Sequence, residues 1–163
     1  MLEIIICLCI QISNSAQHTN TAILTLEINP RVNAIKELQK SNPEKTTTVK
    51  LLLTNYKKDC RDRIVYLNAI FVLIFELFDS MLKANGDGKV SAMAWEAYKV
   101  CPLYKTDNFV KKGGVKAATS TLGSVRQVFD LAAPELQNAQ RIEYIGMATD
   151  LMKRIVSEVE KML

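Results

Sequence analysis

The sequence predicts a mainly α-helical protein, a bundle of about four to five helices with an N-terminal β-hairpin or extension. Three observations lead to this prediction: a long apolar stretch from Ile64 to Leu82, helical periodicity at the C-terminal end, and no alternation of strand-like with helix-like segments. The 163 residues are 48% hydrophobic, which suits one domain with a buried core. We expect the hairpin or extension in residues 1–28 and the helical bundle domain in residues 29–163.

The N-terminal segment has the composition of two β-strands. Residues 2–12 are rich in isoleucine, and residues 21–28 form a second β-leaning stretch after a polar connection. Two strands alone are marginally stable, so Ile4 and Ile6 are candidate partner-binding residues. A cleaved secretion signal is the alternative, but the segment lacks a basic start and carries Glu3 and Gln11. It is also shorter than the roughly 20 residues that span a bilayer.

The helical body begins at Asn29, which we expect to cap a helix with Pro30 at its first position. Asn42-Pro43 gives a second start of the same kind, and the chain then runs to Ala84 without Gly or Pro. This run is either one very long helix or two helices joined near the charged residues 57–63.

The stretch from Ile64 to Leu82 is apolar over slightly more than half of the helical circumference, which is typical of a central bundle helix. A membrane span would bury Glu76 and Asp79 at a cost of about 2.5–3.5 kcal/mol each. We therefore predict a core helix and no membrane span.

Three further helices are expected after residue 84. Ser91 is predicted to cap a helix that ends at Pro102. Gly113-Gly114 is predicted to interrupt helical structure before a helix over residues 115–132. Pro134 is predicted to start the last helix, whose apolar residues fall within about half a turn of the helical wheel.

The net charge of +4 is unevenly spread. Residues 97–126 carry six basic side chains against Asp107 alone, so Lys111, Lys112 and Lys116 are candidate partner-binding residues for an acidic surface or another copy of the chain. The alternative is that these lysines are solvated faces of amphipathic helices. Nucleic acid is a weaker candidate partner because few aromatic residues accompany the lysines.

No catalytic arrangement is apparent. His18 is the single histidine, and Asp79 with Lys83 suits an ion pair at i, i+4. The cysteines at 7, 9, 60 and 101 match no zinc or redox motif, and a bridge between Cys60 and Cys101 is conceivable only in an oxidising compartment. We expect no enzyme activity and no cofactor.

Residues 85–91 are similar to the centre of an EF-hand calcium loop, with Asn85, Asp87 and Ser91 as candidate metal ligands. The same register puts Lys83 and Ala94 where the two anchoring carboxylates are needed. A tight turn without metal is therefore the preferred interpretation.

A long apolar helix, then Asp87-Gly-Lys-Val-Ser91, then a helix with Trp95 resembles small helical proteins of tailed bacteriophages and prophages. The resemblance covers residues 70–100 and implies a non-enzymatic virion or assembly component that docks to neighbouring chains, in the virion or host cytoplasm. The alternatives are a secreted helical effector or inhibitor with a cleaved N-terminus, and a nucleic-acid-associated basic helical protein.

Overall fold

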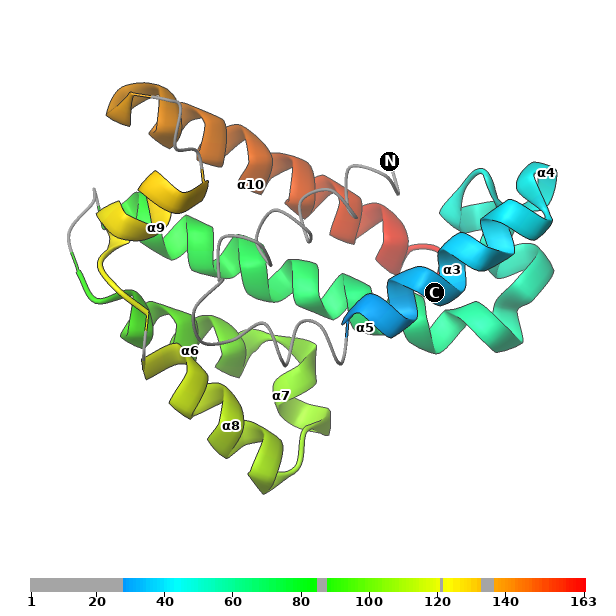
Figure 1. Ribbon diagram of the computed structural model, residues 1–163, viewed down its shortest axis with the longest axis horizontal. Helices are drawn as coiled ribbons and strands as arrows, with labels where there is room; N and C mark the ends of the chain where they lie inside the picture. The colour runs from blue at the N-terminus through cyan, green and yellow to red at the C-terminus, as the bar shows by residue number, and fades with distance from the viewer. Residues whose placement is uncertain (1–27, 85–87, 121, 133–136) are drawn as a thin grey trace. The chain divides into compact units, whose positions relative to one another are not determined.

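The computed structural model describes residues 28–84, 88–120, 122–132 and 137–163 (Figure 1). These residues form eight helices and no strand, which confirms a mainly helical fold and corrects the expected count of four to five helices. Apart from Ile28, the predicted N-terminal hairpin lies outside the described residues, so it and the boundary at residue 28 stay predictions. The chain divides into two compact units: residues up to Asn68 with Glu158–Leu163, and Ala69–Ser157.

The first unit contains α3 (Asn29–Ser41), α4 (Pro43–Thr46) and the first part of α5 (Val49–Lys83). Ile28 is the N-cap of α3, so the predicted cap at Asn29 is wrong, although Pro30 occupies the first turn as expected. Burial of Ile28 favours this earlier start, because its side chain joins the core with the next apolar turns. The buried apolar residues of this unit are Ile28, Val32, Ile35, Leu52, Leu53, Cys60, Ile64, Leu67 and Val159.

Helix α5 is interrupted near its beginning. Tyr56 has φ −133° and ψ 35°, which is outside the helical region, so two helical segments meet there across a kink. The structure thus has two segments joined directly before the charged residues 57–63, which is the second of the two predicted arrangements. The kink separates a short segment, in which Leu52 and Leu53 are buried, from the long segment that continues to Lys83.

The second unit contains the rest of α5 with α6 (Val90–Val100), α7 (Pro102–Thr106), α8 (Phe109–Ser120), α9 (Val125–Ala132) and α10 (Asn138–Glu160) up to Ser157. The predicted apolar face of the last helix is confirmed, with Ile145, Met152 and Ile155 buried. Within this unit α10 lies along α5, where Lys153 Nζ is 2.7 Å from Asp79 Oδ1. The predicted ion pair between Asp79 and Lys83 is also present, at 2.5 Å.

The start and end of α6 differ from the sequence prediction. Gly88, at φ +116°, makes the turn, and Lys89 is the N-cap, so Ser91 lies within the first turn and caps nothing. Pro102 ends α6 as predicted, and it also begins α7 because proline fits a first helical turn.

The predicted break at Gly113-Gly114 is wrong. Both glycines lie within α8, on exposed positions, where glycine costs about 1 kcal/mol relative to alanine without preventing helix formation. The single helix predicted over residues 115–132 is also wrong, because α8 ends at Ser120 and α9 begins at Val125. Ser124 supports the new start, with its Oγ accepting the Gln127 N–H at 3.3 Å.

Helix α5 is the one described helix that is long and apolar enough to cross a membrane. Half of its most apolar stretch is buried within the protein. Core helices of water-soluble proteins share these properties, so length and composition do not distinguish the two.

Candidate functional site

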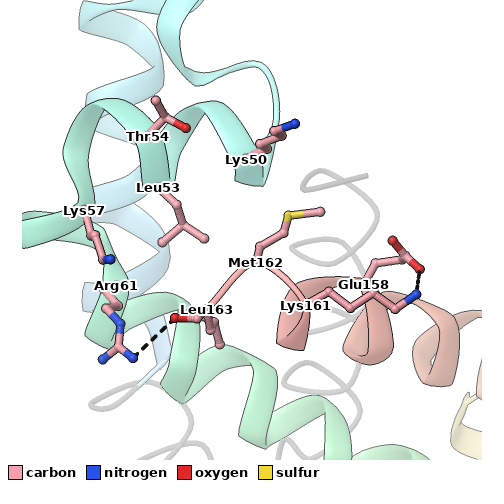
Figure 2. Close-up of a pocket in the computed structure, with 9 residues that line it drawn as sticks. All are labelled: Lys50, Leu53, Thr54, Lys57, Arg61, Glu158, Lys161, Met162 and Leu163. Atoms are coloured by element: carbon pink, nitrogen blue, oxygen red, sulfur yellow. Dashed lines mark hydrogen bonds and ion pairs between the residues drawn. The ribbon is translucent and has the colours of Figure 1, made fainter.

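A pocket of about 560 Å³ lies within the first unit, between the first part of α5 and the end of the chain (Figure 2). Four basic side chains and one acidic side chain line it together with apolar groups. Its lining residues are Lys50, Leu53, Thr54, Lys57, Arg61, Glu158, Lys161, Met162 and Leu163. We call it the basic pocket.

Two of the four cations in the basic pocket already have partners. Lys161 Nζ is 2.6 Å from Glu158 Oε1, and Arg61 Nη2 donates to the carbonyl oxygen of Leu163 at 3.5 Å (Figure 2). All four basic residues are exposed. Water around exposed cations weakens their attraction for an anion. The basic pocket would therefore bind an anion only weakly, with its hydration shell in place.

A second basic group in the same unit involves Arg31, Arg63 and Tyr66, which we call the arginine cluster. The guanidinium of Arg31 on α3 lies 3.9 Å from the centroid of the Tyr66 ring on α5, a cation–π contact. Arg63 is three residues before Tyr66, and residues at this spacing lie on the same side of a helix. All three side chains are half-buried.

The Nε atom of Arg63 is buried and has no hydrogen-bond partner among the residues that the structure describes. A buried, unpaired donor on a charged group costs folding free energy, so native proteins usually satisfy it. Burial raises the pKa of the neighbouring Cys60, and the positive charge of Arg63 offsets part of that rise. The cluster therefore has the chemistry to hold an anion, which arginine binds through two parallel hydrogen bonds.

The second unit brings together three aromatic rings and two lysines from α6, α7 and α8. Trp95, Tyr98 and Tyr104 have ring centroids 5.4 to 6.1 Å apart. Lys112 Nζ lies 4.3 Å from the Tyr104 centroid, and Lys116 Nζ lies 5.7 Å from the Trp95 centroid. The two ammonium groups thus lie over aromatic rings of α7 and α6, and these cation–π contacts link α8 to both helices.

The sequence-predicted site residues are only partly placed by the structure. Ile4, Ile6, Asn85 and Asp87 lie outside the described residues. Ser91 is half-buried in the first turn of α6, and in the described part of the chain no group of three or more His, Cys, Asp or Glu side chains could hold a metal ion.

Lys111, Lys112 and Lys116 share helix α8, with Lys111 and Lys116 exposed and Lys112 half-buried. The sequence interpretation missed the arginine cluster. The sequence does place Arg63 one helical turn before Tyr66. This pair can be recognised as part of a cluster only in the fold, where α3 brings Arg31 onto the Tyr66 ring.

Cys60 and Cys101 are both free and buried, so the bridge considered from the sequence is not formed. The Cys101 Sγ donates to the carbonyl oxygen of Ala69 at 3.1 Å, and burial raises the pKa of this thiol to about 11. A thiol that stays protonated at neutral pH is a poor nucleophile.

The sequence matches no protein-family model and no curated protein. Solved structures do match. The apo form of mouse ceramide-1-phosphate transfer protein aligns with a TM-score of 0.84 and 15% identity, covering 93% of this chain and 79% of that one. The human ceramide-1-phosphate transfer protein in complex with 12:0 ceramide-1-phosphate aligns with a TM-score of 0.81 and 12% identity over the same shares.

These matches overturn the function expected from the sequence. Both solved proteins are named for the transfer of a lipid, so the prediction of a virion or assembly component is wrong, and the secreted-effector and nucleic-acid alternatives are wrong with it. The predicted partners, other protein chains or nucleic acid, are corrected for the same reason. The resemblance of residues 70–100 to phage proteins stays a prediction. At 12–15% identity the likeness establishes architecture: this chain has the all-helical fold of the ceramide-1-phosphate transfer proteins.

Proposed function

We propose that this chain is a non-enzymatic lipid carrier that binds a lipid with a phosphate-bearing headgroup and moves it between membranes. The observation that carries the proposal is the fold, which matches two lipid transfer proteins over 93% of the chain. One of those proteins was solved in complex with its phosphorylated lipid. A carrier of this kind needs a cationic place for the phosphate and apolar surface for the hydrocarbon chains.

We assign the phosphate to the arginine cluster. Arg63 offers a buried donor that no described residue pairs with, and Arg31 is held in place over the Tyr66 ring. Placing a phosphate there would satisfy the donor in a site of low dielectric, where a charged hydrogen bond is strong. The basic pocket is the weaker candidate because its cations are exposed and two of them are already engaged.

The second unit, taken by itself, has apolar surface on α5 that is only partly covered. Val72, Leu73, Ile74, Phe75 and Leu77 are all half-buried there, although each is large and apolar.

The test is transfer of fluorescent ceramide-1-phosphate from donor to acceptor vesicles. We expect the protein to accelerate transfer, and to leave fluorescent ceramide, which lacks the phosphate, at its spontaneous rate. Arg63→Gln removes a charged hydrogen bond of about 1.5–3 kcal/mol, so binding should weaken by about ten- to hundredfold. Absence of transfer by the unmodified chain would refute the proposal.

Two control substitutions locate the site. Arg126→Gln makes the same change at an exposed position on α9 and should transfer at the normal rate. Lys57→Gln removes a cation from the basic pocket, so a loss with this variant and none with Arg63→Gln would move the phosphate to that pocket.

A stability measurement separates binding from folding. Arg63→Met keeps the side-chain length but removes the unpaired donor, which costs about 1–3 kcal/mol when buried. Its free energy of unfolding in urea should therefore be equal to or higher than that of the unmodified protein, while transfer is lost. A large destabilisation would show that Arg63 serves the fold.

A further inference from the structure

One side of the first part of α5 carries a row of basic and polar side chains. Lys50, Thr54, Lys57 and Arg61 follow one another at intervals of three or four residues, the spacing that places side chains on the same side of a helix. All four line the basic pocket. Figure 2 shows Lys57 and Arg61 at one side of the pocket and Lys161 at the other. Cations from two distant stretches of the chain therefore meet around one hollow.

The charges of the basic pocket are unbalanced. Its four basic side chains face one acidic side chain, Glu158, which already pairs with Lys161 at 2.6 Å. The side chains of Lys50 and Lys57 form no ion pair or hydrogen bond with any residue in the described part of the chain. Such a concentration of positive charge in a hollow attracts anions.

The basic pocket is larger than a single phosphate group requires. Its volume of about 560 Å³ lies within the range of small-molecule sites, roughly 300–1,000 Å³. One phosphate would be held only weakly there, because water screens the exposed cations. A ligand with several phosphates contacts several cations at once, so these weak attractions add within one binding event.

The apolar part of the lining lies mostly beneath the charged groups. Leu53 is buried and Leu163 is half-buried, whereas Met162 is 41% exposed. This surface can cover the carbon skeleton of a small ligand. It is less suited to entering a bilayer, which favours a broad exposed apolar face. A ligand that comes from solution is therefore the better match.

We propose that the basic pocket binds a soluble organic polyphosphate, a small molecule that bears several phosphate groups on a carbon skeleton. Lys50 and Lys57 would make the first contacts, since neither has to leave another partner, and Arg61 and Lys161 would complete the ring of donors. The site shares no residue with the arginine cluster, to which we assign the lipid phosphate. The inference therefore does not depend on the proposed lipid carriage.

The first experiment is calorimetric titration of the full chain with inositol hexakisphosphate, and with inorganic phosphate for comparison. We expect the hexakisphosphate to bind at least about tenfold more tightly, because it contacts several cations together. Replacing Lys50 and Lys57 together by Gln should weaken its binding by about fivefold for each charge, about 25-fold in all. Equal affinities for the two probes, or no binding of the hexakisphosphate, would overturn the proposal.

A matched control separates a site from a general effect of charge. Replacing Lys89 and Lys105 together by Gln removes the same charge from two exposed positions of the second unit. This control should bind inositol hexakisphosphate as the unmodified protein does. Equal losses in the two double variants would show that net charge alone attracts the probe, and the proposal would be wrong.

A second comparison separates the basic pocket from the arginine cluster. Arg63→Gln should bind inositol hexakisphosphate normally, and the double variant at Lys50 and Lys57 should still accelerate the transfer of ceramide-1-phosphate. If Arg63→Gln loses the hexakisphosphate, the probe occupies the arginine cluster. If the double variant loses transfer, the pocket holds the lipid headgroup. Either result would overturn the proposal, whereas failure of transfer by the unmodified chain would count only against lipid carriage.

Methionine methyl groups report on the pocket directly. Met162 lines the pocket, whereas Met147, 66% exposed on α10, does not. In a protein labelled with ¹³C at the methionine methyl groups, Met162→Leu and Met147→Leu identify the two signals. Inositol hexakisphosphate should shift the signal of Met162 and leave that of Met147 unchanged. If the Met162 signal does not move at saturation, the probe lies elsewhere and the proposal is wrong.

Discussion

At the scale of the residue, Tyr98 and Asp107 show how one side-chain contact fixes a corner of the second unit. The Tyr98 side chain is buried, and its hydroxyl donates to the Asp107 carboxylate across the end of α6 and the end of α7. Burial, followed by this hydrogen bond, raises the pKa of Tyr98 well above its ordinary value. The neutral phenol is therefore the form that the fold requires.

We expect Tyr98→Phe to lower the free energy of unfolding by about 1.5–3 kcal/mol, the value of a hydrogen bond to a charged group. The change leaves the ring packing against Trp95 and Tyr104 in place. Urea denaturation followed by circular dichroism measures the difference. Tyr144→Phe, at a 45% exposed ring on α10, is the control and should change little; equal effects from both variants would mean that the hydroxyl bond contributes nothing.

At the scale of the element, the contact of Lys153 with Asp79 holds α10 along the second part of α5. The hydrogen bond from Lys153, and then that from Lys83, lowers the pKa of Asp79. A carboxyl whose pKa is lower in the folded state stabilises the fold above its unfolded pKa, near 3.8, and loses that contribution as the pH falls through the folded value.

Asp79→Asn should therefore reduce stability at neutral pH by up to about 1 kcal/mol, as is usual for a partly exposed ion pair. The difference from the unmodified protein should shrink as the pH falls below 3.8 and vanish once the pH is below the lowered pKa of Asp79, where both proteins are uncharged at this position. Urea midpoints measured across this range give the result. Asp150→Asn, at an exposed position on α10, is the control and should change the urea midpoint little, whereas a difference at position 79 that persists in acid would contradict the assignment.

The two exposed glycines of α8 lower the stability of the protein, and substitutions can measure this effect. A Cβ atom added at Gly113 or Gly114 meets nothing within 4 Å. Alanine at either position should raise the free energy of unfolding by about 0.5–1 kcal/mol, because it reduces the freedom of the unfolded chain. Gly88→Ala should do the opposite, since Gly88 has φ +116° and an added Cβ would lie 2.7 Å from Met93 Cε. Thermal unfolding of the three variants tests both signs.

The sequence predicted the helical class, the apolar core helix and the amphipathic last helix, because all three depend on periodicity. It failed at Gly113-Gly114, where the low helix propensity of glycine argues against a helix. Helix α8 forms there nonetheless, because Lys112 and Lys116 hold it against Tyr104 and Trp95. It also failed at the arginine cluster, since the distance between Arg31 and Tyr66 is set by the packing of α3 on α5 and is invisible in a linear pattern.

At the scale of the whole molecule, a bound lipid should stabilise the fold. A ligand that binds only the native state adds about 2.7 kcal/mol to the free energy of unfolding at one hundred times its dissociation constant. We therefore expect ceramide-1-phosphate in detergent micelles to raise the unfolding temperature, and ceramide in the same micelles to raise it much less. Equal shifts for the two lipids would show that the phosphate is not recognised.

The kink at Tyr56 affects how α5 opens. A residue with φ −133° and ψ 35° interrupts the regular ladder of amide-to-carbonyl bonds, so residues 49–55 and the segment after the kink need not open together. Deuterium should enter the short segment through local opening, long before it reaches the amides of the buried turns around Phe71. A continuous ribbon of helix can thus belong to two cooperative folding units.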